Sequence, residues 1–158
     1  MKTINILFCG TGGQGILTAS EIVGRTAVFE GYHAKKSEVH GMAQRGGSVE
    51  SHLRFGKEVF SPIIEKGEVD FLVPFHKGEH DRMAELLKKD GKDLITEFLE
   101  ADKIITDKKY LNTYMLGVLS RYLDLSEESW IKAMTEVFKG KNMDKNIEVF
   151  RSARTNKH

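Results

Sequence analysis

The sequence predicts an α/β domain of the three-layer, Rossmann-like type, with a mostly parallel or mixed central sheet and a helical C-terminal third. Three observations support this fold class. Strand-like and helix-like segments alternate through the first two thirds of the chain, a glycine cluster separates the first of each kind, and the last third has helical spacing. Because no linker, repeat or low-complexity segment interrupts the 158 residues, we expect a single domain over residues 1–158.

The first half of the chain contains four segments of strand length. Residues 4–9, INILFC, are rich in apolar and β-branched residues and end at the glycine cluster. Residues 16–30 then place small and apolar side chains on one helical stripe, which allows this helix to lie close to a sheet. Three further strands are predicted. Residues 33–39 form a polar strand, residues 48–55 alternate between apolar and polar side chains, and the continuously apolar residues 69–74 form a central strand.

The second half of the chain mixes further strands and helices. A hairpin is expected between residues 48–55 and 58–64, with Gly56 and Lys57 at its turn and Pro62 near its end. Ser126, followed by Glu127 and Glu128, has the pattern of a helix N-cap. The other elements expected here are a helix over about residues 80–89, short strands over 93–96 and 103–106, and helices over 112–123 and about 142–153.

Composition limits the classes of partner and compartment. A formal net charge of +1 gives no field that would attract nucleic acid. No apolar run approaches the roughly 18 residues needed to span a bilayer, and the apolar start is too short for a signal peptide. Cys9 is the only cysteine, so the chain can form no internal disulfide and cannot ligate an iron–sulfur cluster through several thiolates. We therefore expect a cytoplasmic protein that contacts neither nucleic acid nor a membrane.

The most informative motif is a glycine-rich block between the first predicted strand and the first predicted helix: Gly10, Thr11, Gly12, Gly13, Gln14 and Gly15. Its spacing matches G-x-G-x-x-G, the dinucleotide fingerprint, and Glu38 lies 23 residues after Gly15, near the position of a ribose-binding acid. Glycines let a backbone approach a ligand, and the N-terminus of the helix offers amides to an anion. The alternative is a turn that serves only tight strand–helix packing.

A second block concentrates polar groups between glycines, and its candidate binding residues are Glu38, His40, Gly41, Gln44, Arg45, Gly46 and Gly47. Arg45 could hold a phosphate or carboxylate through paired hydrogen bonds, and His40 could titrate near neutral pH. The alternative is a solvated surface loop. His76 and His80 share helical spacing but lack a third ligand, so we predict neither a metal site nor a catalytic residue.

Together, GTGGQGILTAS (residues 10–20) and SEVHGMAQRGGSV (residues 37–49) resemble the γ subunit, or γ-type domain, of the 2-oxoacid:ferredoxin oxidoreductases. The second block is most similar to the small β subunit of the indolepyruvate:ferredoxin oxidoreductases. The similarity covers most of the chain and continues through SHLRFG, VFSPIIEKGEVDFLV and NTYMLGVLSRYLDLSEESW. Between about residues 77 and 112 this chain looks shorter than the family pattern.

The resemblance implies a role in anaerobic metabolism. These enzymes oxidise and decarboxylate a 2-oxo acid, such as pyruvate or indolepyruvate, with coenzyme A to give acyl-CoA, carbon dioxide and reduced ferredoxin. Thiamine diphosphate and the iron–sulfur clusters would then belong to larger partner subunits, and ferredoxin would be reached only through them. This chain, inactive alone, would supply an assembly surface and a coenzyme A or anion site at the two glycine blocks. A stand-alone dinucleotide-binding module, a purely structural subunit, and glycine blocks that contact only a partner chain remain open.

Overall fold

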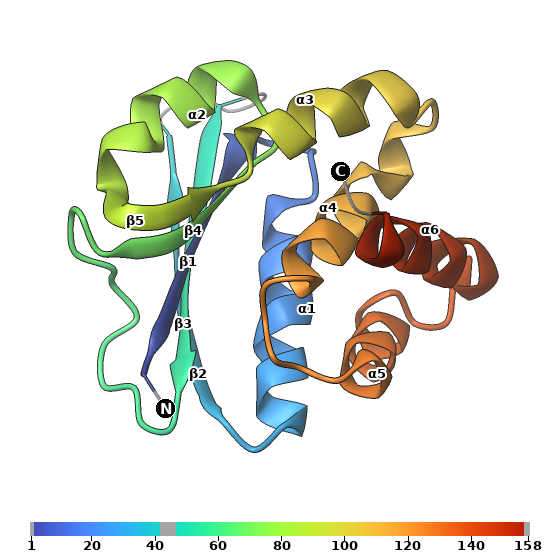
Figure 1. Cartoon of the computed structure of the whole chain (residues 1–158), viewed down its shortest axis with the longest axis horizontal. Helices are drawn as coiled ribbons and strands as arrows, with labels where there is room; N and C mark the ends of the chain where they lie inside the picture. The colour runs from blue at the N-terminus through green and yellow to red at the C-terminus, as the bar shows by residue number, and fades with distance from the viewer. Residues whose placement is uncertain (1, 42–46, 157–158) are drawn as a thin grey trace.

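A computed structural model describes residues 2–41 and 47–156, and these residues form one five-stranded sheet with helices on both faces (Figure 1). The strands lie in the order β2-β3-β1-β4-β5. Their bounds are β1 Ile4–Thr11, β2 His33–His40, β3 Ser48–Gly56, β4 Val69–Pro74 and β5 Leu87–Asp93. β4 runs parallel to both β1 and β5, whereas β3 runs antiparallel to both β1 and β2. The sheet is therefore mixed, and the predicted α/β class is confirmed.

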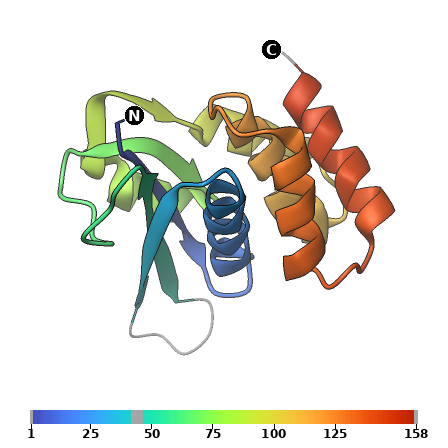
Figure 2. The same ribbon diagram turned by 90° about the horizontal axis from the view of Figure 1, so that it is seen from below.

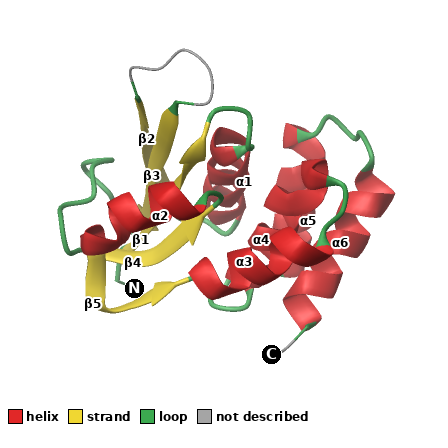
Figure 3. Cartoon of the chain, turned by 90° about the horizontal axis from the view of Figure 1, so that it is seen from above, coloured by secondary structure: helices red, strands yellow, loops and turns green. Residues whose placement is uncertain are grey.

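The helices form layers on either side of this sheet. The bounds of those on the larger side are α1 Ile16–Phe29, α3 Ile95–Ile104, α4 Leu111–Ser120, α5 Glu127–Val137 and α6 Met143–Thr155. α5 and α6 pack on α1 and α4 as an additional outer layer (Figure 2). The short helix α2 (Lys77–Met83) covers the opposite face of the sheet, with α1 on the other side (Figure 3).

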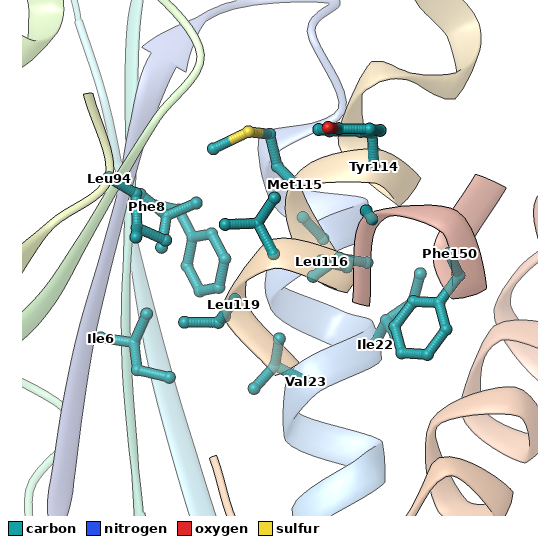
Figure 4. Close-up of a cluster of buried hydrophobic side chains, with 14 of the residues drawn as sticks. Ile6, Phe8, Ile22, Val23, Leu94, Tyr114, Met115, Leu116, Leu119 and Phe150 are labelled. Atoms are coloured by element: carbon teal, nitrogen blue, oxygen red, sulfur yellow. The ribbon is translucent and has the colours of Figure 1, made fainter. Parts of the chain in front are cut away.

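β1 is buried on both faces, which explains its uninterrupted apolar sequence. Ile6 and Phe8 point into the main core, toward α1 and α4, as Figure 4 shows with Val23 and Leu119. The alternate residues Leu7 and Cys9 point to the other face, into a smaller cluster that α2 covers. Cys9 packs there as a small hydrophobic residue.

The predicted hairpin after β3 is wrong. Residues 57–68 contain no strand, because β1 and β2 already occupy both edges of β3. The segment instead crosses the α2 face of the sheet. The guanidinium of Arg54 donates to the carbonyl of Ser61 at 2.8 Å, and the backbone amide of Ile64 donates to Nδ1 of His52 at 3.3 Å. Pro62 therefore lies in a loop that two side chains of β3 hold.

The region between residues 77 and 106 was also predicted with errors. The helix expected up to residue 89 ends earlier, in a single 3-10 turn (Ala84–Leu86), and β5 begins at Leu87. The two short strands expected at residues 93–96 and 103–106 fall mostly within α3 or next to it. β5 has the polar sequence LKKDGKD because it is an edge strand with little buried surface, so alternation could not indicate it.

The C-terminal helices match their predictions closely. Ser126 caps α5, since its Oγ accepts a hydrogen bond from the amide of Ser129 at 3.2 Å. Asn142 is the N-cap residue of α6. α4 and α6 approach each other at Gly117, where an added Cβ would lie 2.5 Å from the carbonyl oxygen of Phe150 and 2.6 Å from the Cβ of Ala153. Gly117 is therefore needed for this contact.

Gly117→Ala should lower the free energy of unfolding by about 1–3 kcal/mol, because α6 would have to move away from α4. Gly24→Ala is a matched control inside α1, since its added Cβ would meet only Leu53 Cδ1 at 3.5 Å. The higher helix propensity of alanine predicts that this control is as stable as the natural chain or more so. Chemical denaturation followed by circular dichroism measures both variants, and equal stabilities would contradict the close contact.

Candidate functional site

The first glycine block forms the tight turn that leads from β1 into α1, as predicted. Gly13 (φ 89°) and Gly15 (φ 80°) have left-handed backbone conformations that other residues rarely adopt. The side chain of Gln14 closes the turn, because its Oε1 accepts a hydrogen bond from the amide of Thr11 at 2.7 Å. Gly10 and Thr11 extend β1 beyond its predicted end by pairing with β3. The turn is thus held by its own backbone and one amide side chain.

The two glycine blocks lie next to each other. The amide of Gly12 donates to the carbonyl of Gly47 at 3.0 Å, and the amide of Gly41 donates to the carbonyl of Ser48 at 2.6 Å. The described ends of the second block are therefore fixed beside the first block. Gln44, Arg45 and Gly46, three of the predicted site residues, lie outside the described residues.

A cavity of about 260 Å³ opens beside this turn. It is lined by residues 11–13 and 15–18, together with His40 and Val49. Within the part of the chain that the structure describes, no side chain caps α1, whose N-cap residue is Gly15. The first backbone amides of α1 have no hydrogen-bond partner within the helix, and they lie beside this cavity. The positive end of the helix dipole lies at the same place. The arrangement suits a small anion.

A second cavity, of about 520 Å³, lies on the other side of the turn. Its lining joins residues 13–15 to the end of α3, the connection that follows it and the start of α4, through Asp102, Lys108, Lys109, Leu111 and Asn112. Lys108 Nζ lies 3.1 Å from Asp102 Oδ1, and Lys109 Nζ lies 3.6 Å from Asp107 Oδ2. Both pairs are solvent-exposed, so they contribute little and can be exchanged for contacts with a ligand. Sequence reasoning missed these lysines, because no motif links them to the glycine turn.

Gly15 is needed for its positive φ angle and also for its close contact with Asn112. A Cβ added to Gly15 would lie 2.7 Å from Asn112 Nδ2. The start of α4 therefore packs directly on the glycine turn. This contact brings Lys108 and Lys109 close to a loop that is almost a hundred residues away in the sequence.

Glu38 is not brought to the glycine turn. β3 lies between β1 and β2, so Glu38 is separated from β1 by a whole strand. Its carboxylate lies 3.4 Å from Lys36 Nζ and 4.0 Å from His40 Nε2, and it lines neither cavity. In a dinucleotide-binding fold the acid follows a strand that is adjacent to β1. The ribose contact predicted from the spacing therefore lacks its geometry, and His40 takes the place beside the turn.

Comparisons with known proteins bear directly on this arrangement. The family model described as pyruvate ferredoxin/flavodoxin oxidoreductase matches residues 5–102 and 96–155, and both glycine blocks lie within the matched region. The chain belongs to this family. Within it, the chain is of the γ type.

Two curated relatives are similar to this chain over different parts of its length. Pyruvate synthase subunit PorC of Methanothermobacter thermautotrophicus is 31% identical over 95% of this chain and 93% of that protein. Indolepyruvate oxidoreductase subunit IorB of Thermococcus kodakarensis is 44% identical over 58% of this chain. That alignment covers only 45% of IorB, so the chain spans less than half of this relative.

Solved structures have the same fold. The γ subunit of a keto/oxoacid ferredoxin oxidoreductase from Geobacter sulfurreducens has a TM-score of 0.76, with 22% identity and 96% of each chain covered. A 2-oxoglutarate:ferredoxin oxidoreductase from Magnetococcus marinus, solved with 2-oxoglutarate, coenzyme A and succinyl-CoA bound, has a TM-score of 0.81 at 17% identity. The match covers 98% of this chain and 31% of that one. These similarities establish the fold.

In this γ-type chain, a cluster of charged side chains on the α2 face fixes the second block. Glu79 accepts hydrogen bonds from Ser48 Oγ at 2.8 Å and from Arg82 Nε at 2.9 Å. Burial alone would raise the pKa of Glu79, but the hydrogen bonds from Arg82 and Ser48 hold it below its usual range. The carboxylate therefore stays ionised and ties α2 to the end of the second glycine block.

Two histidines of α2 and its N-cap, His80 and His76, are also engaged. His80 Nε2 lies 2.7 Å from Asp93 Oδ2, and His76 caps α2 by accepting from the amide of Glu79 at 3.2 Å. Across residues 2–41 and 47–156, no group of three or more His, Cys, Asp or Glu side chains could hold a metal ion. In the same residues, no helix has both the length and the apolar character to cross a membrane.

Cys9 should resist alkylation in the folded chain. Burial raises the pKa of its thiol to about 12, with a further contribution from Glu79. At pH 8 the thiolate fraction is then roughly a thousandfold lower than that of an ordinary cysteine. Intact-mass analysis after iodoacetamide treatment should show slow labelling of the native chain and fast labelling in guanidinium chloride. Equal rates in both conditions would contradict the buried position of this residue.

Proposed function

We propose that this chain is the γ-type component of a 2-oxoacid:ferredoxin oxidoreductase complex and has no redox chemistry of its own. The observation that carries the proposal is the family match, which spans nearly all of the chain and contains both glycine blocks. A single buried cysteine with a raised pKa does not fit the ligand set of an iron–sulfur cluster. Thiamine diphosphate and the clusters are therefore assigned to larger partner subunits, which pass electrons on to ferredoxin.

The proposed reaction of the assembled enzyme is the oxidative decarboxylation of a 2-oxo acid. The carbon–carbon bond beside the carboxylate breaks, carbon dioxide leaves, and the acyl group forms a thioester with coenzyme A while ferredoxin accepts the electrons. An aryl pyruvate such as indolepyruvate is the proposed substrate, because the identity to an indolepyruvate oxidoreductase subunit is 44%. Pyruvate is the alternative, supported by the full-length similarity to pyruvate synthase subunits.

The glycine turn is the proposed coenzyme A contact of this chain. Coenzyme A carries a pyrophosphate and a 3′-phosphate, and both need donors and positive charge. The uncapped start of α1 supplies amides, while Lys108 and Lys109 supply ammonium groups on the other side of the turn. A Cβ added at Gly13 would meet no atom within 4 Å, so space for a ligand lies directly above the turn. An enzyme that shares this fold was solved with coenzyme A bound.

A stand-alone dinucleotide-binding module is less well supported. Its main argument was the spacing between Gly15 and Glu38, but β3 separates Glu38 from the turn. Glu38 is also engaged by Lys36. The proposed ligand is therefore one that presents phosphates to the turn without needing a ribose-binding acid. Arg45 remains a predicted additional phosphate contact in the second block.

Lys109→Ala should weaken the binding of coenzyme A to the full chain about tenfold, through loss of one charge-assisted contact. Lys145→Ala is the matched control, because Lys145 is also exposed and lies 3.5 Å from a single carboxylate oxygen, that of Glu148. Isothermal titration calorimetry measures both variants against the natural chain. Pantetheine, which lacks phosphates, should show no difference between them. Equal affinities of Lys109→Ala and Lys145→Ala for coenzyme A would remove Lys109 from the site.

The purified chain alone should be colourless and should not oxidise 2-oxo acids, even with added thiamine diphosphate. Co-expression with a thiamine- and cluster-bearing partner should give coenzyme A-dependent reduction of ferredoxin or a viologen dye. Cluster absorbance or 2-oxo acid oxidation in the isolated chain would overturn the proposed role. Tight binding of NAD by the isolated chain, with no gain of activity on co-expression, would instead support the dinucleotide module.

A further inference from the structure

β2 is an edge strand that carries both positive and negative side chains, at Lys35, Lys36 and Glu38. It pairs with β3 on one side, and the described residues provide no strand on its other side. Most of its side chains are exposed, although it is eight residues long. A long exposed edge is a template for pairing with another strand, and soluble proteins usually block or occupy such edges.

The register of β2 shows which backbone groups face outward. Gly41 and Ser48 form the pair that continues the β2–β3 ladder, and the amide of Gly41 donates to the carbonyl of Ser48. In an antiparallel ladder such hydrogen-bonded pairs alternate with pairs that are not bonded. Ser37 and Val39 therefore direct their backbone groups toward β3, whereas Lys36 and Glu38 direct theirs toward the open edge.

A groove lined by both apolar and charged side chains runs along the same edge. It has a volume of about 370 Å³ and lies between α1 and β2. Its apolar lining includes Val28, Ala34 and Leu53, and its charged lining includes Glu21 and Lys36. Val28 is 54% exposed, although it lies on the helix that packs against the sheet. A strand added to β2, together with the helix that covers it, would bury this groove.

The charges of β2 are self-complementary in one register. Two copies of a strand can pair antiparallel about a twofold axis that is normal to the sheet. Side chains that lie opposite each other then point to the same face of the sheet. Opposite residues must therefore both have even numbers or both have odd numbers, so the axis passes through a residue. Centring the pair on Ser37 places Lys36 of each copy opposite Glu38 of the other. Centring it on Lys36 or on Glu38 would place like charges opposite each other.

We propose that β2 pairs with β2 of a second copy of this chain, antiparallel and centred on Ser37, so that the two sheets become continuous. Lys36 and Glu38 of opposite copies then exchange backbone hydrogen bonds and form two symmetric ion pairs. Lys36 Nζ already lies 2.6 Å from Glu21 Oε1 of α1, which holds this ammonium on the face where Glu38 also lies. The pairing rests on the strand register and on the charges of β2, not on the coenzyme A proposal.

Ser37→Cys tests the twofold position directly in the full chain. Ser37 would lie opposite itself in a pair that is not hydrogen-bonded, where the Cα atoms are about 4.5 Å apart, within the range of a disulfide. Mild oxidation should therefore link most of the variant into dimers through residue 37. Lys35→Cys is the matched control, because position 35 would face Val39 and lie roughly 13 Å from its own copy. The buried Cys9 should give no link in the natural chain.

Charge reversal provides a second test. Lys36→Glu and Glu38→Lys should each weaken dimerisation about tenfold or more, because each replaces two attractive pairs with two repulsive ones. An equimolar mixture of the two variants should dimerise like the natural chain, since opposite charges face each other again. Sedimentation velocity measures dimerisation, and circular dichroism checks that each variant folds.

Three results would overturn the proposal. The first is a natural chain that stays monomeric at about 100 μM, a concentration at which a dissociation constant in the micromolar range gives mostly dimer. The second is a dimer that neither single charge reversal weakens, or that the mixture of variants does not restore. The third is equal oxidative linkage of the Ser37→Cys and Lys35→Cys variants, which would indicate random collision or an edge strand occupied by a different protein.

Discussion

β3 runs antiparallel between β1 and β2, and most of the functional geometry of this chain follows from that one placement. Pairing of Gly10 and Thr11 with Val49 and Ser48 brings the second glycine block beside the first. The same pairing occupies both edges of β3 and moves β2 to the outside of the sheet. In dinucleotide-binding folds a parallel strand occupies the position of β3, and the acidic residue after that strand lies beside the turn.

The parts of the fold that the sequence predicted correctly are those whose pattern reflects burial. β1, β4 and the three C-terminal helices have apolar positions at strand or helix spacing, and each was found close to its predicted bounds. β5 was missed because an edge strand buries too little surface to need apolar alternation. The segment after Gly56 was misread because strand propensity alone does not reveal that the neighbouring edge is occupied.

The candidate site divides in the same way. The positive φ angles of Gly13 and Gly15 are a local requirement of the turn, and the glycines at these positions indicate it in the sequence. This part of the site could therefore be predicted. Lys108, Lys109 and Asn112 reach the turn only through the packing of α4 against it, which no local spacing encodes. Conversely, the spacing of Glu38 suggested a contact that the strand order prevents. Distances along the chain predict a site only when the strand order is known.

His40 connects the glycine turn to the edge of the sheet. It lines the cavity beside the turn, whereas its backbone, like those of Lys36 and Glu38, faces the open edge of β2. In the proposed pairing, Ala34 of the second copy lies opposite His40, and its small side chain leaves the imidazole room to stay in its own cavity. A ligand that orders His40 and a strand that pairs with it therefore act on the same residue. Because coupling between two binding events is reciprocal, any effect of the ligand on the strand pairing must equal the effect of the pairing on ligand binding.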